Sequence, residues 1–237
     1  MIIRYLLMKK RLKAILFDLD DTLFLEKDFV KSGFKAVASY IQKNNGNDEE
    51  IIFNNLWSIF NSGKRKNIFD LYIKKFGDNI YSINEMVDLY RSHTPDINLL
   101  HGINKYLLSL SKHYKLGLVT DGYIQTQKNK INVLGLKKIF DRIIITEELG
   151  RQFWKPSIVP FSKICDSLEV SPMEAIYIAD NPKKDFKGPN QLGMHSIRLR
   201  LKDGEYYKSE PENKDFAPTS VVYNIENLKI EVNQYNV

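Results

Sequence analysis

Five short apolar runs alternate with helical patterns in this 237-residue chain, and this alternation constrains its fold more than any other feature. Each run is short enough for a buried strand. The runs are residues 12–19, 116–120, 142–146, 175–179 and 195–201. Strands that alternate with helices pair in parallel through right-handed crossovers. The sequence therefore predicts an α/β core built on a doubly wound, Rossmann-like parallel sheet.

The stretch from residue 28 to 97 interrupts this alternation because it contains no convincing strand pattern. Its apolar residues recur at helical spacing, and its many aromatic residues follow the same spacing, so we interpret them as a helical core of their own. Ser82 and Glu85 form a capping-box pattern at the start of the last helix. We expect about four helices here, as an all-helical domain at 28–97 inserted into a core domain of residues 1–27 and 98–237.

The composition excludes several classes of protein. A hydrophobic content of 43% and a charged content of 27% are ordinary for a globular chain, which excludes a wholly disordered one. No apolar run reaches the length of about 18 residues that a membrane span needs, so we expect no membrane partner. The net charge is +6, yet no basic stretch is interleaved with aromatic residues. We therefore expect no nucleic-acid partner.

The cysteine and histidine residues argue against a disulfide framework or a zinc site. Cys165 is the only cysteine, it falls on the apolar face of a predicted helix, and one thiol suits a reducing cytoplasm. We expect it to be buried and inert. The four histidines have no paired metal-ligand spacing. The N-terminal residues lack the features of a secretory signal, whether translation starts at Met1 or Met8, so we expect a cytoplasmic protein.

Polar side chains gather where the predicted strands end, which is where ligands bind in open α/β sheets. These residues are, in chain order, Asp18, Asp20, Thr120, Asp121, Lys155, Asp180 and Asp185. Several carboxylates in one crevice raise each other's pKa values unless a cation neutralises them. A hard divalent ion with oxygen ligands does so, and Mg²⁺ binds one or two carboxylates together with water and a substrate phosphate. The sequence therefore predicts a Mg²⁺ site.

The same set of residues suits phosphoryl chemistry. Thr120 supplies a hydroxyl donor and Lys155 a positive charge, and both are typical phosphate ligands. An aspartate at a strand end beside Mg²⁺ can act as a nucleophile and form an aspartyl-phosphate. A second aspartate two residues further on can donate and accept the proton.

Four segments resemble the motifs of a known family. Residues 14–23, AILFDLDDTL, are similar to the first motif of the haloacid dehalogenase superfamily, in its phosphatase branch. The segments VTDG at 119–122, Lys155-Pro156 and IADNPKKDF at 178–186 resemble its second, third and fourth motifs. The helical insert fits the C1-type helical cap of that family, so the resemblance implies the same α/β core with an inserted cap.

The resemblance implies a role for each acidic residue. By position, Asp18 is the nucleophile and a Mg²⁺ ligand. Asp20 is the general acid for the leaving oxygen and then the base for water, and its backbone carbonyl also binds the metal. Asp180 is a direct metal ligand, and Asp185 supports the metal.

The resemblance also implies a phosphate site, with two departures from the family pattern. Thr120 and Lys155 hold the transferred phosphoryl group, with Asp121 beside them. The family usually has Asn where this chain has Asp121, and Gly where it has Ala179. A second acid beside phosphate is compatible with this site if its carboxylate points away, as in relatives that share Thr-Asp-Gly.

The motifs together predict a Mg²⁺-dependent phosphomonoesterase that acts through an aspartyl-phosphate. Asp20 favours a phosphate ester over a halide, because halide leaves without protonation. A helical cap favours a small phosphorylated metabolite, such as a sugar phosphate or a nucleotide. A phosphomutase of the β-phosphoglucomutase type shares all four motifs and stays an alternative, as does a non-catalytic phosphate-binding module, although pure binding does not need Asp20. The sequence leaves the oligomeric state open.

Overall fold

The computed structural model describes residues 12–46, 48–77 and 82–236 of the chain. The expectations about a secretory signal and about a start at Met1 or Met8 concern residues outside these ranges. No helix among the described residues is both long and apolar enough to cross a membrane.

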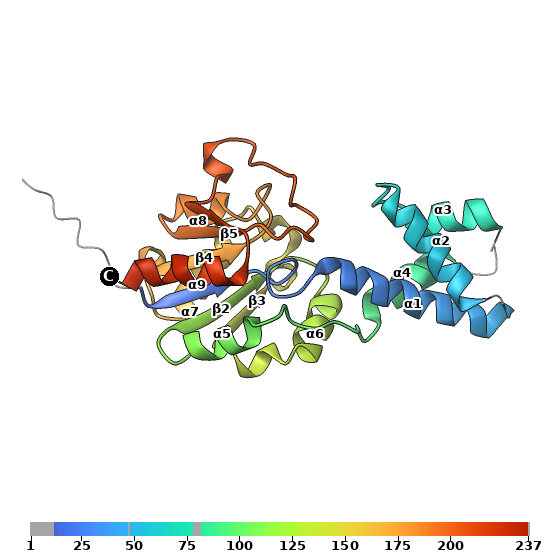
Figure 1. The fold of residues 1–237 in the computed structure, drawn as a ribbon, viewed down its shortest axis with the longest axis horizontal. Coiled ribbons are helices and arrows are strands. Elements are labelled where there is room, and N and C mark those ends of the chain that lie inside the picture. The colour runs from blue at the N-terminus through green and yellow to red at the C-terminus, as the bar shows by residue number, and fades with distance from the viewer. Residues whose placement is uncertain (1–11, 47, 78–81, 237) are drawn as a thin grey trace, which may run out of the picture. The chain divides into compact units, whose positions relative to one another are not determined.

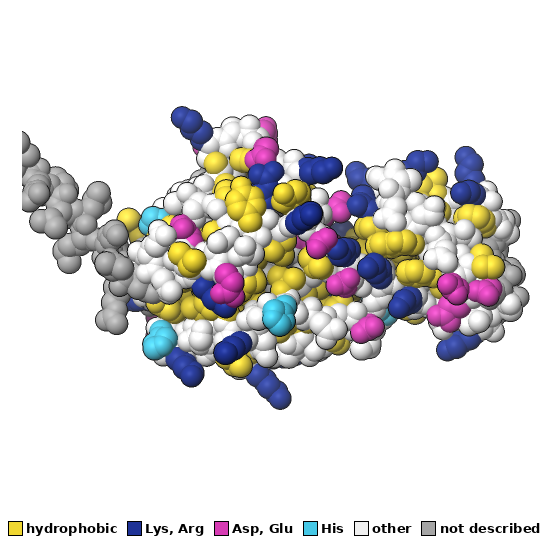
Figure 2. Space-filling model, in the orientation of Figure 1, with side chains coloured by type: hydrophobic (Ala, Val, Ile, Leu, Met, Phe, Trp, Pro, Cys, Tyr) yellow, Lys and Arg dark blue, Asp and Glu magenta, His cyan; other side chains and the backbone are white. Residues whose placement is uncertain are grey.

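The described residues form two compact units (Figure 1). The core unit consists of residues 12–25, 99–122 and 136–236. The helical unit consists of residues 26–98 and 123–135. On the face shown in Figure 2, Lys and Arg side chains are dispersed, with acidic side chains between them.

Six strands of the core unit, counted over the described residues, form one parallel sheet in the order β3-β2-β1-β4-β5-β6. They are β1 (Ala14–Phe17), β2 (Lys115–Thr120), β3 (Arg142–Ile145), β4 (Ala175–Ala179), β5 (His195–Leu199) and β6 (Ser220–Val222). The five predicted strands and the doubly wound α/β core are confirmed. The sequence does not predict β6, because three residues after a polar stretch do not form a recognisable strand pattern.

The strand order places a topological switch point between β1 and β4. From β1 the chain proceeds outward through β2 to β3, and it then returns to β4 on the other side of β1. Right-handed crossovers in opposite directions place helices on both faces of the sheet. In such sheets, ligands bind beyond the carboxyl ends of the strands at the switch point.

The core of this unit lies between the sheet and its helices. These helices are α5 (Ile103–Leu110), α7 (Val159–Ser167), α8 (Lys187–Gln191) and α9 (Ile225–Asn233). Short 3-10 helices lie at Leu136–Lys138, Thr146–Leu149, Arg151–Phe153, Pro172–Glu174, Lys214–Phe216 and Gln234–Asn236. Leu16 and Tyr177 of the central strands pack against Phe161 and Ile164 of α7 without any solvent exposure. Cys165 is buried as predicted, and burial raises the pKa of its thiol to about 12.

The helical unit contains the helices of the predicted insert. They are α1 (Glu26–Asn45), α2 (Glu49–Asn61), α3 (Ile68–Phe76) and α4 (Ile83–Ser92). The predicted capping box of α4 is confirmed, since the Glu85 N–H donates to Ser82 Oγ and the Ser82 N–H donates to Glu85 Oε2. Phe34 packs edge-on against Phe60 and Phe69 in the middle of this core.

One further helix, α6 (Ile124–Val133), belongs to the same compact unit. It follows β2 in the chain, in the stretch that the sequence assigns to the core domain. Thr126 Oγ1 donates to Arg91 O at 3.0 Å, and Asn129 Nδ2 donates to Ser92 O at 2.9 Å. These bonds tie α6 to the end of α4.

Candidate active site

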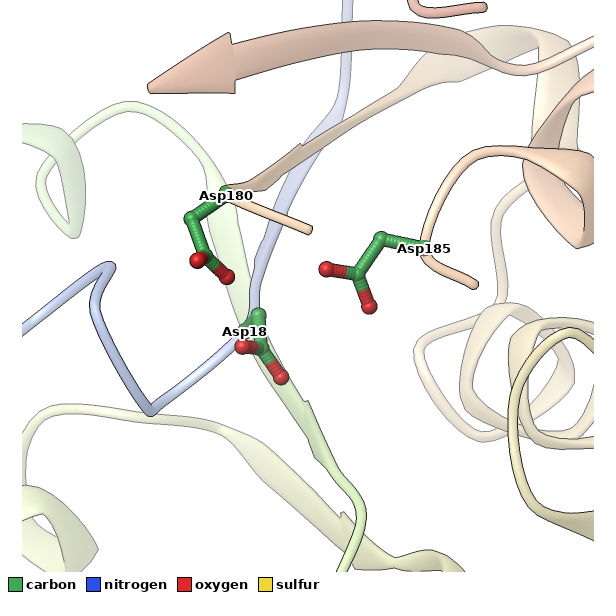
Figure 3. A group of neighbouring side chains, drawn as sticks. All are labelled: Asp18, Asp180 and Asp185. Atoms are coloured by element: carbon green, nitrogen blue, oxygen red, sulfur yellow. The ribbon is translucent and has the colours of Figure 1, made fainter. Parts of the chain in front are cut away.

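Three buried carboxylates meet at the switch point (Figure 3). Asp18 directly follows β1, and Asp180 directly follows β4. These strands pair in parallel with Phe17 opposite Ile178, so both carboxylates emerge at the same edge of the sheet. Asp185 comes from the turn before α8 and points toward the other two side chains. Carboxylate oxygens of the three residues lie within 4.8 Å of one another.

Lys155 reaches the same point from the loop before α7. Its Nζ lies 2.5 Å from Asp18 Oδ1 and 2.7 Å from Asp185 Oδ1. It also donates to the Tyr177 hydroxyl at 3.1 Å. The side chains of Lys155 and Asp185 have no exposed surface. The Lys155 ammonium therefore meets Asp18 and Asp185 in a water-excluded environment, where charge interactions are strong.

Burial and charge act in opposite directions on Asp18 and Lys155. Burial raises the pKa of Asp18 to about 7, although the nearby Lys155 lowers it and Asp185 raises it further. Burial also disfavours a charged Lys155, but Asp18 and Asp185 outweigh this effect and hold its pKa well above the usual value. Lys155 therefore stays an ammonium ion at neutral pH, whereas Asp18 is poised to exchange a proton for another cation.

The donor set fits a hard divalent cation. The three carboxylates carry more negative charge than Lys155 offsets. The ion pair between Lys155 and Asp185 does not have hydrogen-bond geometry, so Asp185 Oδ1 is a buried oxygen without a hydrogen-bond donor among the described residues. Clustered carboxylate oxygens are the ligands that Mg²⁺ selects. Asp18, Asp180 and Asp185 are three of the four residues that the sequence predicts as metal ligands, and they supply oxygens of this kind.

Asp20 lies outside this three-carboxylate group. It is half-buried in the turn that follows Asp18, and its backbone pairs with that of Phe24. The Leu23 N–H donates to Leu19 O at 2.9 Å and closes the turn. Asp20 is close enough to Asp18 to raise the pKa of that residue.

Thr120 and Asp121 stand at the end of β2, on the side of β1 away from β4. Thr120 is fully buried and pairs with Ile145 of β3. Asp121 Oδ1 accepts hydrogen bonds from Thr146 Oγ1 at 2.8 Å and from the Lys155 N–H at 3.1 Å. The Asp121 carboxylate thus points toward β3 and the Lys155 loop.

A second lysine completes the partners of Asp121. Lys184 Nζ donates to Asp121 Oδ2 at 2.9 Å. Burial would raise the pKa of Asp121, but Lys155 and Lys184 outweigh it and hold this pKa below its usual range. Asp121 therefore remains a carboxylate that braces the second, third and fourth motif segments against one another.

Four residues that make hydrogen bonds at the site were not predicted from the sequence. They are Thr146, Tyr177, Lys184 and Arg198. Arg198 has a recognisable signal in the sequence, because it is a charged residue inside an apolar run. In the structure its side chain is only 1% exposed. The others carry no such signal, since Tyr177 and Thr146 are ordinary strand residues by type, and Lys184 lies in a lysine-rich segment.

Two curated proteins are similar to this chain over most of its length. A curated protein from Methanocaldococcus jannaschii, named glyceraldehyde 3-phosphate phosphatase, is 31% identical over 92% of this chain and 99% of its own length. A protein of the same name from Methanopyrus kandleri is 28% identical over 87% of this chain and 91% of its own.

A solved structure extends the comparison to the fold. A HAD-hydrolase from Bacillus subtilis, bound to magnesium, matches with a TM-score of 0.65 at 20% identity, over 94% of this chain and 100% of that one. The family model described as haloacid dehalogenase-like hydrolase matches residues 15–199, which include every motif segment named above except the start of the first. On this evidence the chain belongs to the haloacid dehalogenase-like hydrolase family.

Proposed function

We propose that this protein is a Mg²⁺-dependent phosphomonoesterase that hydrolyses a small phosphorylated metabolite through an aspartyl-phosphate on Asp18. The observation that carries the proposal is the buried convergence of Asp18, Asp180 and Asp185 on Lys155. The two relatives named glyceraldehyde 3-phosphate phosphatase support a phosphate ester as substrate, and a sugar phosphate ahead of a nucleotide.

The metal in this proposal is held by the aspartates at the switch point. Asp18 and Asp180 would bind it through their carboxylates, Asp20 through its backbone carbonyl, and Asp185 would support it. When bound, Mg²⁺ offsets the negative charge that develops on the transferred phosphoryl group. The donor set described above fits this role, since its oxygens are clustered and buried.

In the first step, a carboxylate oxygen of Asp18 attacks phosphorus, and the bond between phosphorus and the ester oxygen breaks. Asp20 donates a proton to that oxygen, so that the product leaves as an alcohol. The phosphoryl group is then bonded to Asp18. The ammonium of Lys155, 2.5 Å from Asp18 Oδ1, favours the ionised and therefore nucleophilic form of Asp18.

In the second step, water attacks the phosphorus of the aspartyl-phosphate. Asp20, now a carboxylate, accepts a proton from this water, and the bond between phosphorus and Asp18 breaks. Inorganic phosphate leaves, and both aspartates return to their initial states. Lys155 and the Thr120 hydroxyl would hold the phosphoryl oxygens in both steps.

Asp121 is proposed to act beside the phosphate. Its carboxylate oxygens already accept bonds from Thr146, Lys155 and Lys184. Direct contact with a phosphate oxygen would add repulsion between like charges. Asp121 therefore contributes by fixing the backbone of Lys155.

Residues 28–97 are proposed to form the cap domain that selects the leaving group. Helices α1 to α4 have a core of their own and supply no member of the carboxylate group. A helical domain inserted directly after the first motif can change its surface without disturbing the chemistry. As part of this proposal we place the enzyme in the cytoplasm, where its unpaired Cys165 stays reduced.

The proposal is tested by measuring phosphate release from a panel of sugar phosphates, nucleotides and an aryl phosphate, with Mg²⁺ and with EDTA. We expect metal-dependent release, highest with small sugar phosphates. Asp18→Asn is the control, because the amide keeps the shape of the side chain but is not a nucleophile. It should lower kcat by on the order of 10⁴-fold or more.

Two outcomes would contradict the proposal. Turnover by Asp18→Asn close to that of the unmodified protein would remove the assigned nucleophile. A rearranged sugar phosphate without net phosphate release would identify a mutase instead.

A further inference from the structure

A buried arginine lies behind the proposed metal site. Arg198 is on β5, opposite Ala179 of the neighbouring strand β4, and is 1% exposed. Proteins seldom bury a guanidinium unless its donors have partners. Arg198 Nε donates to the Asp180 carbonyl oxygen at 2.9 Å. The arginine therefore contacts the backbone of a proposed metal ligand.

The peptide group that follows the Asp180 side chain is held from both of its polar ends. Its carbonyl oxygen accepts the bond from Arg198, and its N–H, on Asn181, donates to Asp185 Oδ2 at 2.9 Å. This peptide lies just beyond β4. These two bonds hold the backbone from which the Asp180 carboxylate reaches toward Asp18 and Asp185.

Arg198 also bonds to the segment at residues 205–210, and this segment contacts the first motif. Arg198 Nη2 donates to the Tyr206 carbonyl oxygen at 2.7 Å. The preceding residue, Glu205, donates its N–H to Asp21 Oδ2 at 2.8 Å. Asp21 is next to Asp20 and has a left-handed backbone with φ of 50°, a conformation that needs such support. Two consecutive residues thus connect the first motif segment to Arg198, which in turn bonds to Asp180 of the fourth.

We propose that Arg198 is a positioning residue for the metal site, which orients Asp180 directly and supports the Asp20–Asp21 turn through residues 205 and 206. This inference rests on the proposed function, because it assigns Arg198 a role toward Mg²⁺. Removing a residue that orients a metal ligand typically lowers metal affinity by roughly 10- to 100-fold. A guanidinium suits this role because its planar fork can bond two separate carbonyls.

Arg200, directly after β5 and two residues beyond Arg198, provides a matched control. It donates to the Tyr207 carbonyl oxygen at 2.6 Å and to Glu210 Oε1 at 2.6 Å. It therefore holds the same segment as Arg198, although no bond joins it to Asp180 among the contacts of the described residues. A loss of support for the segment alone would appear in both arginine variants.

The test measures Mg²⁺ binding to the full chain by titration calorimetry for Arg198→Met, Arg198→Lys and Arg200→Met. Thermal melting without metal is recorded for each. We expect Arg198→Met to weaken Mg²⁺ binding by about 10- to 100-fold, with a smaller loss in Arg198→Lys, which keeps the charge but not the fork. Arg200→Met should bind Mg²⁺ as the unmodified protein does. At saturating Mg²⁺, KM for the substrate should be unchanged in all three.

Each result decides between the inference and its alternatives. Unchanged Mg²⁺ affinity in Arg198→Lys, or an equal loss in Arg200→Met, would overturn the inference and leave the proposed function intact. If Arg198→Met does not fold, Arg198→Lys decides alone. If the unmodified protein binds no Mg²⁺, the proposed metal site fails, and the role of Arg198 fails with it.

Discussion

At the residue scale, the carboxylates of the site differ in the partners that hold them. Asp18 and Asp185 share Lys155, whereas Asp121 has three donors of its own. Asp18 can therefore exchange its partner for a metal ion or a substrate, whereas Asp121 holds neighbouring segments in place. This difference follows from burial, because a buried charge must find either a fixed partner or a ligand.

If Asp20 is the general acid, the effect of replacing it should depend on the leaving group of the ester. We expect Asp20→Asn to slow hydrolysis by on the order of 10²- to 10⁴-fold for an alkyl phosphate, and much less for an aryl phosphate, because a good leaving group departs without a proton. The measurement is kcat/KM across esters of graded leaving-group pKa. Equal slowing for all esters would argue against proton donation by this residue.

Metal binding should depend on pH through Asp18. The pKa of this carboxyl is raised to about 7 by burial, so below that value it carries a proton that Mg²⁺ must displace. Apparent Mg²⁺ affinity should therefore fall by up to about tenfold per pH unit below pH 7 and level off above it. Titration calorimetry between pH 5.5 and about 8.5 tests this expectation. A flat profile would contradict the assigned ligand.

At the scale of elements, each unit contains polar contacts that the pattern of apolar residues does not predict. His93 follows α4, and its Nδ1 contacts Tyr90 O at 2.7 Å while its Nε2 contacts Ser32 Oγ at 3.1 Å. Because a carbonyl only accepts, Nδ1 carries the proton, and Nε2 accepts from the Ser32 hydroxyl. The Asp96 N–H donates to the same Ser32 oxygen at 2.8 Å. His93 is one of the four histidines without metal-ligand spacing in the sequence, and in the structure it is buried.

His93 should make the helical unit less stable in acid. Burial lowers the pKa of His93, and Lys130 lowers it further, so the folded state stays neutral where the unfolded chain is protonated. Stability is then lost as the pH falls below the unfolded pKa of about 6.5, by at most about 1.4 kcal/mol per pH unit.

Urea unfolding of a Trp154→Phe variant, in which Trp57 of α2 reports on the helical unit, measures this loss at several pH values. His93→Gln does not titrate, so it should reduce the pH dependence. The same slope in both proteins would show that other groups are responsible.

The elements themselves were largely predictable from the sequence. Fully buried strands of a parallel sheet are continuous apolar runs, and 175–179 has the predicted bounds. Helix starts with side-chain caps, such as Ser82, were equally clear. The strand β6 and the helix α9 were missed, because short elements at a sheet edge are stabilised by their neighbours more than by their own pattern.

At the scale of the whole molecule, the described residues form a core unit built on the parallel sheet and a helical unit with a core of its own. All residues of the carboxylate group and Lys155 belong to the core unit. Metal binding should therefore act first on the stability of that unit.

Mg²⁺ should raise the melting temperature of the core unit, since a ligand that binds only the folded state stabilises it. At a concentration of about 100 times Kd, this stabilisation is about 2.7 kcal/mol, or roughly 5–10 °C for a domain of this size. Fluorescence of Trp154 in a Trp57→Phe variant follows the transition with Mg²⁺ and with EDTA. An unchanged midpoint would mean that no metal binds the folded core.

The sequence by itself determined the alternation of strands and helices, the helical insert and the strand-end residues that converge at the switch point. It could do so because hydrophobic periodicity is a local pattern. Strands that alternate with helices form a parallel sheet, and the residues that follow the strands meet at one edge of it. Only the tertiary structure decided which partners each charge has: Asp121 turned toward Thr146 and Lys184, Tyr177 beside Lys155, and Arg198 behind Asp180. These contacts join residues far apart in the chain, and their energies depend on burial and on distances of a few ångströms, which no local pattern encodes.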